Sequence, residues 1–124
     1  MQTLIGKKIG MTRVYDADGV QVPVTVVQVG PCTVVQRKSK DADGYEAVQL
    51  GFGEQKEARL GKPLQGHFKK AGAKAAKVLR EVRVDAAEGA KPGDVVTAQV
   101  FEGVKFVDVL AHTKGRGLDR KSVV

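Results

Sequence analysis

The chain has 124 residues, enough for one domain with its own core, and 42% of them are hydrophobic, which excludes an intrinsically disordered chain. Cys32 is the single cysteine, so an intramolecular disulfide is excluded and a reducing, cytoplasmic compartment is the simplest interpretation. The N-terminus shows no signal peptide, and no stretch reaches the about 18 consecutive apolar residues that cross a membrane.

Valine-rich runs predict a mainly β fold along the whole chain. β-branched side chains favour strands, and short strands separated by regular turns are typical of an all-β barrel or sandwich. Pro23 has no backbone N–H, so it is expected at an edge, at a bulge or at the start of its strand. The expected strands are Gln21–Val29, Cys32–Arg37, Tyr45–Phe52, Val78–Val84, Val95–Phe101 and Phe106–Ala111.

The tetrapeptide Asp-Ala-Asp-Gly occurs twice, at Asp16–Gly19 and at Asp41–Gly44. Asp side chains bond to nearby backbone and Gly adopts a positive φ, so both copies predict hairpin loops. The alternative is a twelve-residue calcium loop, which requires a Glu at its last position. That position is Val27 or Phe52 here, so the hairpin loop is favoured.

One segment has a helical pattern. Small apolar residues recur at helical spacing after Phe68, and a single helix through this segment is one interpretation. Pro63 is a typical helix start and Gly72 a typical stop, which favours a short helix near Pro63–Ala71. A basic loop and the alternating strand Val78–Val84 are then expected to follow.

The formal net charge of +7 is concentrated in residues 55–83. This segment holds nine cations and two acids, whereas the rest of the chain holds 12 of each. A local excess of positive charge favours a polyanionic partner over a general effect on solubility. The nine cations are Lys56, Arg59, Lys62, Lys69, Lys70, Lys74, Lys77, Arg80 and Arg83.

No residue pattern indicates catalysis. His67 and His112 are the only histidines, and no cluster has the spacing of metal ligands. Cys32 lies in a valine run, where a buried small hydrophobe is the simplest interpretation. Gly51–Gly53 fails the dinucleotide fingerprint, and no phosphate-binding P-loop is present. We therefore predict no enzyme, no cofactor, no metal and no small-molecule substrate.

Three shorter basic motifs lie outside the charged segment. IGKKIGMTR near the N-terminus is either an RNA contact or an ordinary first strand with exposed lysines. RKSK, with Arg37, Lys38 and Lys40, is either a contact or a solvated turn. HTKGRG (His112–Gly117) lacks acids, which favours RNA contact over a plain loop.

The small apolar residues of the charged segment indicate structured RNA as the partner. A helix that binds a membrane surface carries large apolar anchors, and this segment has mainly alanine. Sequence-specific reading of single strands uses exposed aromatic residues, and the whole chain has two Tyr and four Phe. Lys and Arg beside small residues suit packing against phosphates.

Four motifs together resemble a known family. IGKKIGMTRVYDADGVQVPVTVVQV, GHFKKAG, VLREVRV and FEGVKFVDVLAHTKGRG occur here in the order typical of the bacterial large-subunit ribosomal protein L-three family. The resemblance covers about residues 3–117. It implies a translation-protein-type β-barrel, interrupted by a long extension that reaches toward the peptidyl-transferase centre.

The resemblance also implies a function. Members of this family are structural, non-catalytic constituents of the large subunit in the cytoplasmic ribosome; they bind its rRNA directly, early in assembly, beside neighbouring ribosomal proteins. Motif positions that carry over as RNA-facing are Lys7, Lys8, Thr12, Arg13, His67, Lys69, Lys70, Thr113, Lys114 and Arg116. The charge excess adds Lys56, Arg59, Lys62, Lys74 and Lys77. The alternative is a free-standing basic β-barrel RNA-binding module, such as a translation-factor-like domain or an RNA chaperone.

The resemblance ends after Gly117, where the family continues into its extension and further strands. We therefore expect an N-terminal fragment with an incomplete barrel core at residues 1–111 and the start of the extension at residues 112–117. Residues 118–124 are expected to be a tail that is not native to the family.

Overall fold

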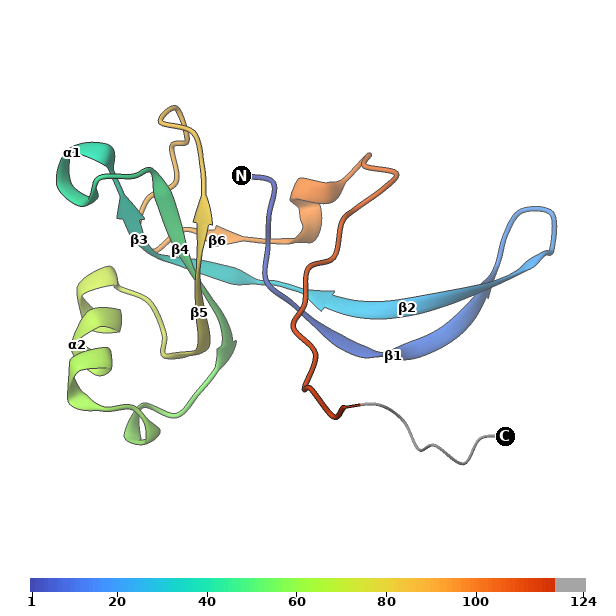
Figure 1. The fold of residues 1–124 in the computed structure, drawn as a ribbon, viewed down its shortest axis with the longest axis horizontal. Helices are drawn as coiled ribbons and strands as arrows, with labels where there is room; N and C mark the ends of the chain where they lie inside the picture. The colour runs from blue at the N-terminus through green and yellow to red at the C-terminus, as the bar shows by residue number, and fades with distance from the viewer. Residues whose placement is uncertain (118–124) are drawn as a thin grey trace.

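Two antiparallel β-sheets form the framework of the protein, which we describe from a computed structural model for residues 1–117. One sheet is the two-stranded hairpin β1–β2, and the other has the strand order β5-β4-β3-β6. Figure 1 shows the hairpin extending away from the four-stranded sheet. The elements in chain order are β1 (Gly6–Tyr15), β2 (Gln21–Val29), β3 (Cys32–Lys38), α1 (Lys40–Asp43), β4 (Ala47–Glu54), η1 (Glu57–Arg59), α2 (Lys62–Ala71), β5 (Ala76–Arg83), β6 (Val95–Val96) and η2 (Ala98–Phe101).

The hairpin β1–β2 confirms the first predicted turn. The Asp16 carboxylate accepts hydrogen bonds from the backbone N–H groups of Asp18 (3.0 Å) and Val20 (2.8 Å), and Gly19 has a φ of 78°. Pro23 lies opposite Arg13 in a sheet of two strands, so it occupies an edge strand, as predicted.

The second predicted turn joins β3 to β4, but it contains one turn of helix. Residues Lys40–Asp43 form α1, and Gly44 ends it with a φ of 83°. The two strands that it connects are antiparallel, from Thr33 opposite Gly51 to Lys38 opposite Ala47. The prediction that Asp41–Gly44 connects two antiparallel strands is confirmed. The connection is a short helix and not the expected compact turn.

The four-stranded sheet has a core on each face. On one face the cluster of Cys32, Val34, Val48 and Leu50 is fully buried beneath the N-terminal residues and the loop after β5. On the other face Val35 packs against Phe68 of α2, which is 3% exposed. Val34 and Val35 are consecutive in β3 and so point to opposite faces, and the register of β3 against β4 shifts at this point, between Val34 and Gln36. Cys32 is a buried small hydrophobe, as predicted.

Close packing of side chains from the neighbouring strands β3 and β5 explains one glycine of the Gly51–Gly53 motif. A Cβ atom at Gly51 would lie 2.9 Å from the Cβ of Ala76 and 3.3 Å from a methyl of Val35. Gly53 has a φ of 78°, which favours glycine for a different reason. The motif therefore has a structural role in β4.

The predicted short helix is confirmed as α2. Pro63 lies in its first turn, and Gly72 ends it with a φ of 67°. The N–H of Ala73 then bonds to the carbonyl of Phe68 (3.1 Å), a common way to close a helix. The basic loop is shorter than expected, because β5 already begins at Ala76 and takes Lys77 into the sheet.

Of the two strands predicted near the C-terminus, one is confirmed over two residues only and the other is wrong. Of Val95–Phe101, only Val95–Val96 pairs with β3, while Ala98–Phe101 is the 3-10 helix η2. Phe106–Ala111 has no regular secondary structure, and Leu110 is 96% exposed. A strand needs a partner for its backbone, and no described strand pairs with this segment.

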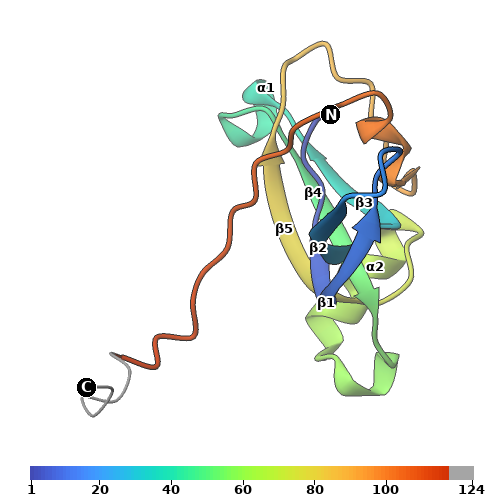
Figure 2. The same ribbon diagram turned by 90° about the vertical axis from the view of Figure 1, so that its right-hand side faces the viewer.

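The mainly β fold class is confirmed, with α2 as its main helix. Within residues 1–117 the two sheets do not close into a barrel. Figure 2 shows the segment after η2 leaving the sheets. In this part of the chain, no helix combines the length and apolar character needed to cross a bilayer. The predicted tail, residues 118–124, lies outside the described residues.

Candidate nucleic-acid interface

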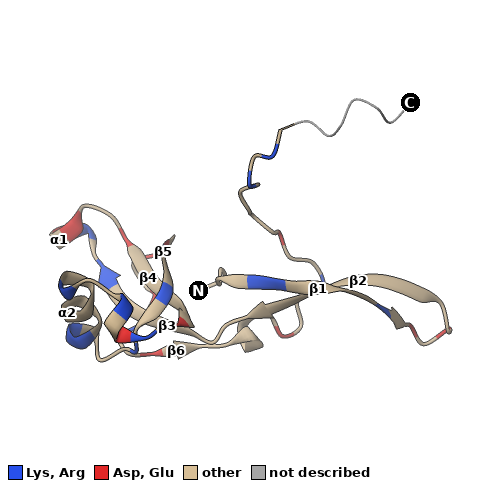
Figure 3. Cartoon of the chain, turned by 90° about the horizontal axis from the view of Figure 1, so that it is seen from below, with Lys and Arg blue, Asp and Glu red and all other residues tan. Residues whose placement is uncertain are grey.

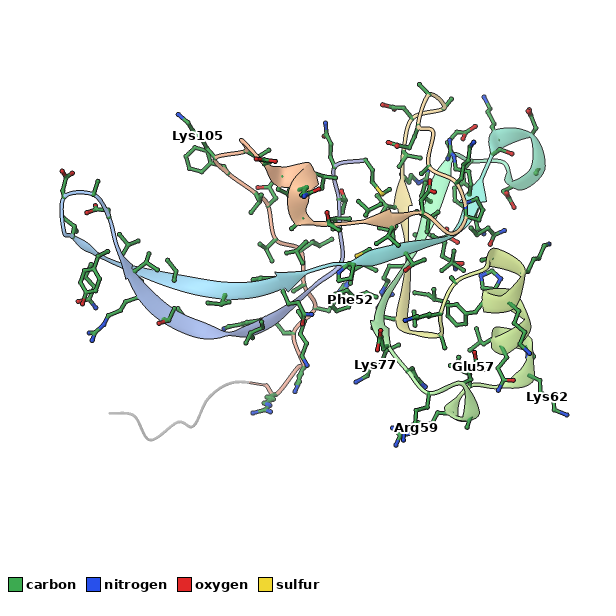
Figure 4. All side chains as sticks on the ribbon, turned by 180° about the vertical axis from the view of Figure 1, so that it is seen from behind. Phe52, Glu57, Arg59, Lys62, Lys77 and Lys105 are labelled. Atoms are coloured by element: carbon green, nitrogen blue, oxygen red, sulfur yellow. The ribbon has the colours of Figure 1, made fainter. Side chains whose placement is uncertain are left out.

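Seven exposed cations from three successive elements and their connections form what we call the basic surface. They follow β4, pass through η1 and α2, and reach the start of β5. Arg59, Lys62 and Lys77 point outward at the same end of the four-stranded sheet in Figure 4. The basic surface consists of Lys56, Arg59, Lys62, Lys69, Lys70, Lys74 and Lys77.

Almost all of this charge is unpaired. Lys74 has a carboxylate neighbour, Glu54, at 4.0 Å, but both side chains are about nine-tenths exposed, at 90% and 88%. No other cation of the basic surface lies within 4.0 Å of a carboxylate among the described residues. Exposed pairs of this kind contribute little to stability, so the positive charge is available to a ligand.

The cations of RKSK differ from those of the basic surface, because two of them form ion pairs with carboxylates of the protein itself. Arg37 pairs with Glu46 at 2.8 Å and donates to the backbone carbonyl of Ala47 at 3.2 Å. Lys38 pairs with Glu81 of β5 at 3.0 Å. These bonds connect β3 with Glu46, with β4 and with β5. Arg37 and Lys38 are therefore neither part of a solvated turn nor free to contact phosphate.

Tyr45 lies at the centre of this second group. Its hydroxyl donates to Glu81 at 2.5 Å, and this bond, with the ion pair to Lys38, holds the pKa of Glu81 below its ordinary value. The same carboxylate raises the pKa of Lys38. Arg83 lies over the Tyr45 ring, 5.4 Å from its centre. Arg83 therefore belongs to this cluster more than to the basic surface.

His67 faces the sheet. Its ring is half-buried, and its Nε2 lies 2.7 Å from the Oε1 of Gln49 on β4. Two positions earlier, the Gln65 side-chain amide donates to the carbonyls of Glu57 (2.8 Å) and Leu60 (2.9 Å). These two side chains connect α2 with β4 and with η1.

Sequence reasoning missed Gln49 and Gln65. Neither has a charge, a motif or a periodicity that distinguishes it from a solvated surface residue. The partner of Gln49 is His67, 18 residues away along the chain. The partners of Gln65 are backbone carbonyls, which carry no sequence signal. Only tertiary structure brings these groups together.

The predicted residues of β1 lie elsewhere. Lys7, Lys8, Thr12 and Arg13 are all exposed on the hairpin. Lys7 and Lys8 are consecutive in a strand, so their side chains point to opposite faces. Figure 3 shows the basic residues of β1 at a distance from α2.

Thr113, Lys114 and Arg116 are exposed on the segment that leaves the sheets. Gly115 and Gly117 in the same segment have φ values of 67° and 75°. Figures 1 and 3 both place this end of the described chain away from α2. The cations of the basic surface therefore lie on the successive elements η1, α2 and β5 and their connections, and the other two predicted groups lie elsewhere.

The described residues contain no group of three or more His, Cys, Asp or Glu side chains that could hold a metal ion. The carboxylate of Asp16 already accepts two backbone N–H groups. The calcium alternative for the first Asp-Ala-Asp-Gly turn therefore has no set of ligands in this part of the chain.

Comparison with known proteins gives one consistent result. No family model matches the chain. It is 53% identical over 114 residues, 92% of its length, to large ribosomal subunit protein uL3 of Heliobacterium modesticaldum. It is 52% identical over 117 residues to the protein of that name from Thermotoga maritima and 50% identical over 114 residues to that from Corynebacterium jeikeium, which cover 94% and 92% of the chain. The aligned regions are 54%, 55% and 52% of these three relatives, so the chain spans about half their length.

Proposed function

The chain belongs to the uL3 family of large-subunit ribosomal proteins, and from this premise we propose that it binds the RNA of the large subunit directly through the basic surface. The proposal rests on one observation. Seven exposed cations come from one short stretch of chain, and six of them lack a carboxylate neighbour within the described residues.

The chemistry of the surface favours the phosphate backbone of folded RNA. Lys and Arg release counterions when they neutralise phosphates, and this release supplies affinity that does not depend on base sequence. Phe68 is the single Phe, Tyr or Trp among the residues between them, and it is buried in the core of the protein. Base stacking on aromatic side chains is therefore not part of the proposed binding mode.

The role that we propose is structural and not catalytic. The chain would act in the ribosome of the bacterial cytoplasm, beside neighbouring large-subunit proteins and near the peptidyl-transferase centre, and would help to nucleate subunit assembly. Lys7, Lys8, Thr12 and Arg13 of the hairpin would form a second RNA contact. We further propose that residues 112–117, with Thr113, Lys114 and Arg116, begin an extension from the core at residues 1–111.

The test compares two triple variants. Lys69, Lys70 and Lys77 are replaced by Gln in the first, which leaves out Lys74 because of its neighbour Glu54. The matched control replaces the exposed cations Lys40, Lys91 and Lys105, which lie outside the basic surface. Both variants lose three charges, so a difference between them reports location and not net charge.

Affinity for an in-vitro transcript of the Thermotoga maritima large-subunit rRNA is measured over a series of salt concentrations. For the first variant, the slope of log K against log salt should become shallower by about one unit for each lost phosphate contact. The control should change it much less. Equal changes in both variants would mean that the RNA is attracted by the net charge of the protein and not by the basic surface. No change in either variant would refute the proposal. Co-sedimentation with large subunits at high salt then separates a ribosomal constituent from a free-standing RNA-binding module.

A further inference from the structure

We propose that His67 is a positioning residue, which aligns the cations of α2 with the RNA by bonding to Gln49 and does not itself contact the RNA. This inference rests on the proposed function, because it specifies how the basic surface is held in a binding geometry. The observation behind it is the 2.7 Å contact between His67 Nε2 and Gln49 Oε1.

The contact is the one side-chain hydrogen bond between α2 and the four-stranded sheet in residues 1–117. The remaining attachment of α2 to the sheet is apolar and is centred on Phe68, which packs with Val35 and Ala75. Apolar packing is not directional, so it sets the distance of the helix from the sheet more than its rotation. A hydrogen bond weakens steeply when its angle changes, and the bond from His67 therefore limits this rotation.

Rotation of α2 matters because Lys69 and Lys70 follow His67 in the last turn of the same helix. Successive residues are about 100° apart around a helix axis, so a small rotation about Phe68 moves both ammonium groups sideways. Side chains that are held in the binding geometry before the ligand arrives lose less freedom on binding. The His67–Gln49 bond thus improves affinity without a contact of its own.

The geometry also argues against direct contact of the imidazole with phosphate. The amide oxygen of Gln49 can only accept, so Nε2 is the donor in this contact, and in a neutral ring Nδ1 then carries no proton to donate. The ring is half-buried against β4, whereas Lys69 and Lys70 are exposed. The cations are the groups that meet the ligand, and the imidazole supports them from the side of the sheet.

The test uses the 124-residue chain and the same Thermotoga maritima rRNA transcript. The variants are His67→Leu, Gln49→Leu, the double variant and His67→Gln, whose amide nitrogen can take the place of Nε2 as a donor. Circular dichroism checks that each variant folds. Loss of one neutral hydrogen bond corresponds to about fivefold in an equilibrium constant, and this sets the largest effect on the docking of α2, so His67→Leu and Gln49→Leu should each weaken binding by up to about fivefold.

The double variant should be no weaker than either single one, because both remove the same bond. The His67→Gln variant should bind like the unchanged protein. The salt dependence should become shallower in both single variants, which a purely structural role of His67 would not produce. If His67→Leu fails to fold, loss of affinity in Gln49→Leu and retention in His67→Gln still support the proposal.

Loss of affinity in His67→Leu without loss in Gln49→Leu would overturn the inference in favour of direct contact. Additive losses in the double variant would overturn it as well. A Lys69→Gln and Lys70→Gln variant serves as the reference for the proposed function. If that variant binds normally, the RNA surface itself is wrong; if it binds weakly while Gln49→Leu binds normally, only the positioning role is wrong.

Discussion

The four-stranded sheet and the β1–β2 hairpin both have strands with several apolar side chains, but the burial of these side chains is very different. Val34, Val48 and Leu50 of the sheet are 0% exposed, whereas Ile9 and Met11 of the hairpin are 65% and 66% exposed. Other parts of the chain cover both faces of the four-stranded sheet. The hairpin is a sheet of two strands, and many of its apolar side chains are exposed. Apolar patterning thus makes strands in both regions, and only packing against another layer makes a core.

The largest difference between the regions should appear when an apolar side chain is truncated. Leu50→Ala removes a fully buried side chain, and we expect the free energy of unfolding to fall by about 3 kcal/mol. Met11→Ala removes a side chain of the hairpin that is already in water, so its effect should stay within about 0.5 kcal/mol. Urea denaturation followed by far-UV circular dichroism measures both.

Equal destabilisation by the two truncations would break the comparison. It would mean that the hairpin is covered in solution by another surface, such as a second copy of the chain. Sedimentation velocity at two protein concentrations would then identify self-association. A loss confined to Leu50→Ala would confirm that the stability of the chain resides in the four-stranded sheet.

An intermediate effect is expected when a methyl group is added instead. The Cβ atom of Gly51→Ala would lie 2.9 Å from Ala76, so the sheet must shift, at a cost of about 1–3 kcal/mol. Gly10→Ala is the matched control, because a Cβ atom there meets nothing within 4 Å and its φ is not positive. Thermal melts of both variants test this contrast, and a normal melting temperature for Gly51→Ala would contradict the close packing.

The smallest expected effect concerns the ion pairs on the surface of the sheet. The pKa of Glu81 is lowered in the folded protein, from an ordinary value of 4.5, by the bonds from Tyr45 and Lys38. Its contribution to stability is therefore fully present above pH 4.5 and is lost as the pH falls through the lowered pKa. Because this ion pair lies at the surface and remains in contact with solvent, the contribution of Glu81 should be at most about 1 kcal/mol.

Glu81→Gln should accordingly lower the melting temperature slightly at pH 7. At a pH well below 4.5, the variant and the unchanged protein should melt together, since both then carry a neutral side chain. A difference that persists at low pH would show that the hydroxyl of Tyr45 and not the charge of Glu81 provides the stabilisation.

Charge shows a second contrast within the molecule. Arg37 and Lys38 bind carboxylates of their own chain, whereas the cations of α2 have none within the described residues. Counting charges in the sequence cannot separate these cases, because the partner Glu81 is 43 positions from Lys38 along the chain. Pairing across β3, β4 and β5 brings them together.

The sequence by itself determined the class of the fold, the positions of the two hairpin connections, the extent of α2 and the segment that carries the charge. Each of these depends on local chemistry: β-branched side chains favour strands, Asp and Gly form turns, and Pro63 and Gly72 bound a helix. The resemblance to the L-three family likewise rested on contiguous motifs, and the relatives confirm it.

Tertiary structure alone decided which apolar runs form sheets and which polar residues support the basic surface. Phe106–Ala111 has the composition of a strand, but it has no strand beside it in residues 1–117 and is exposed. The bonds of His67 and Gln65 depend on the docking of α2 and η1 and leave no local pattern. Strand pairing and docking join residues that are distant along the chain, so no local propensity can specify them.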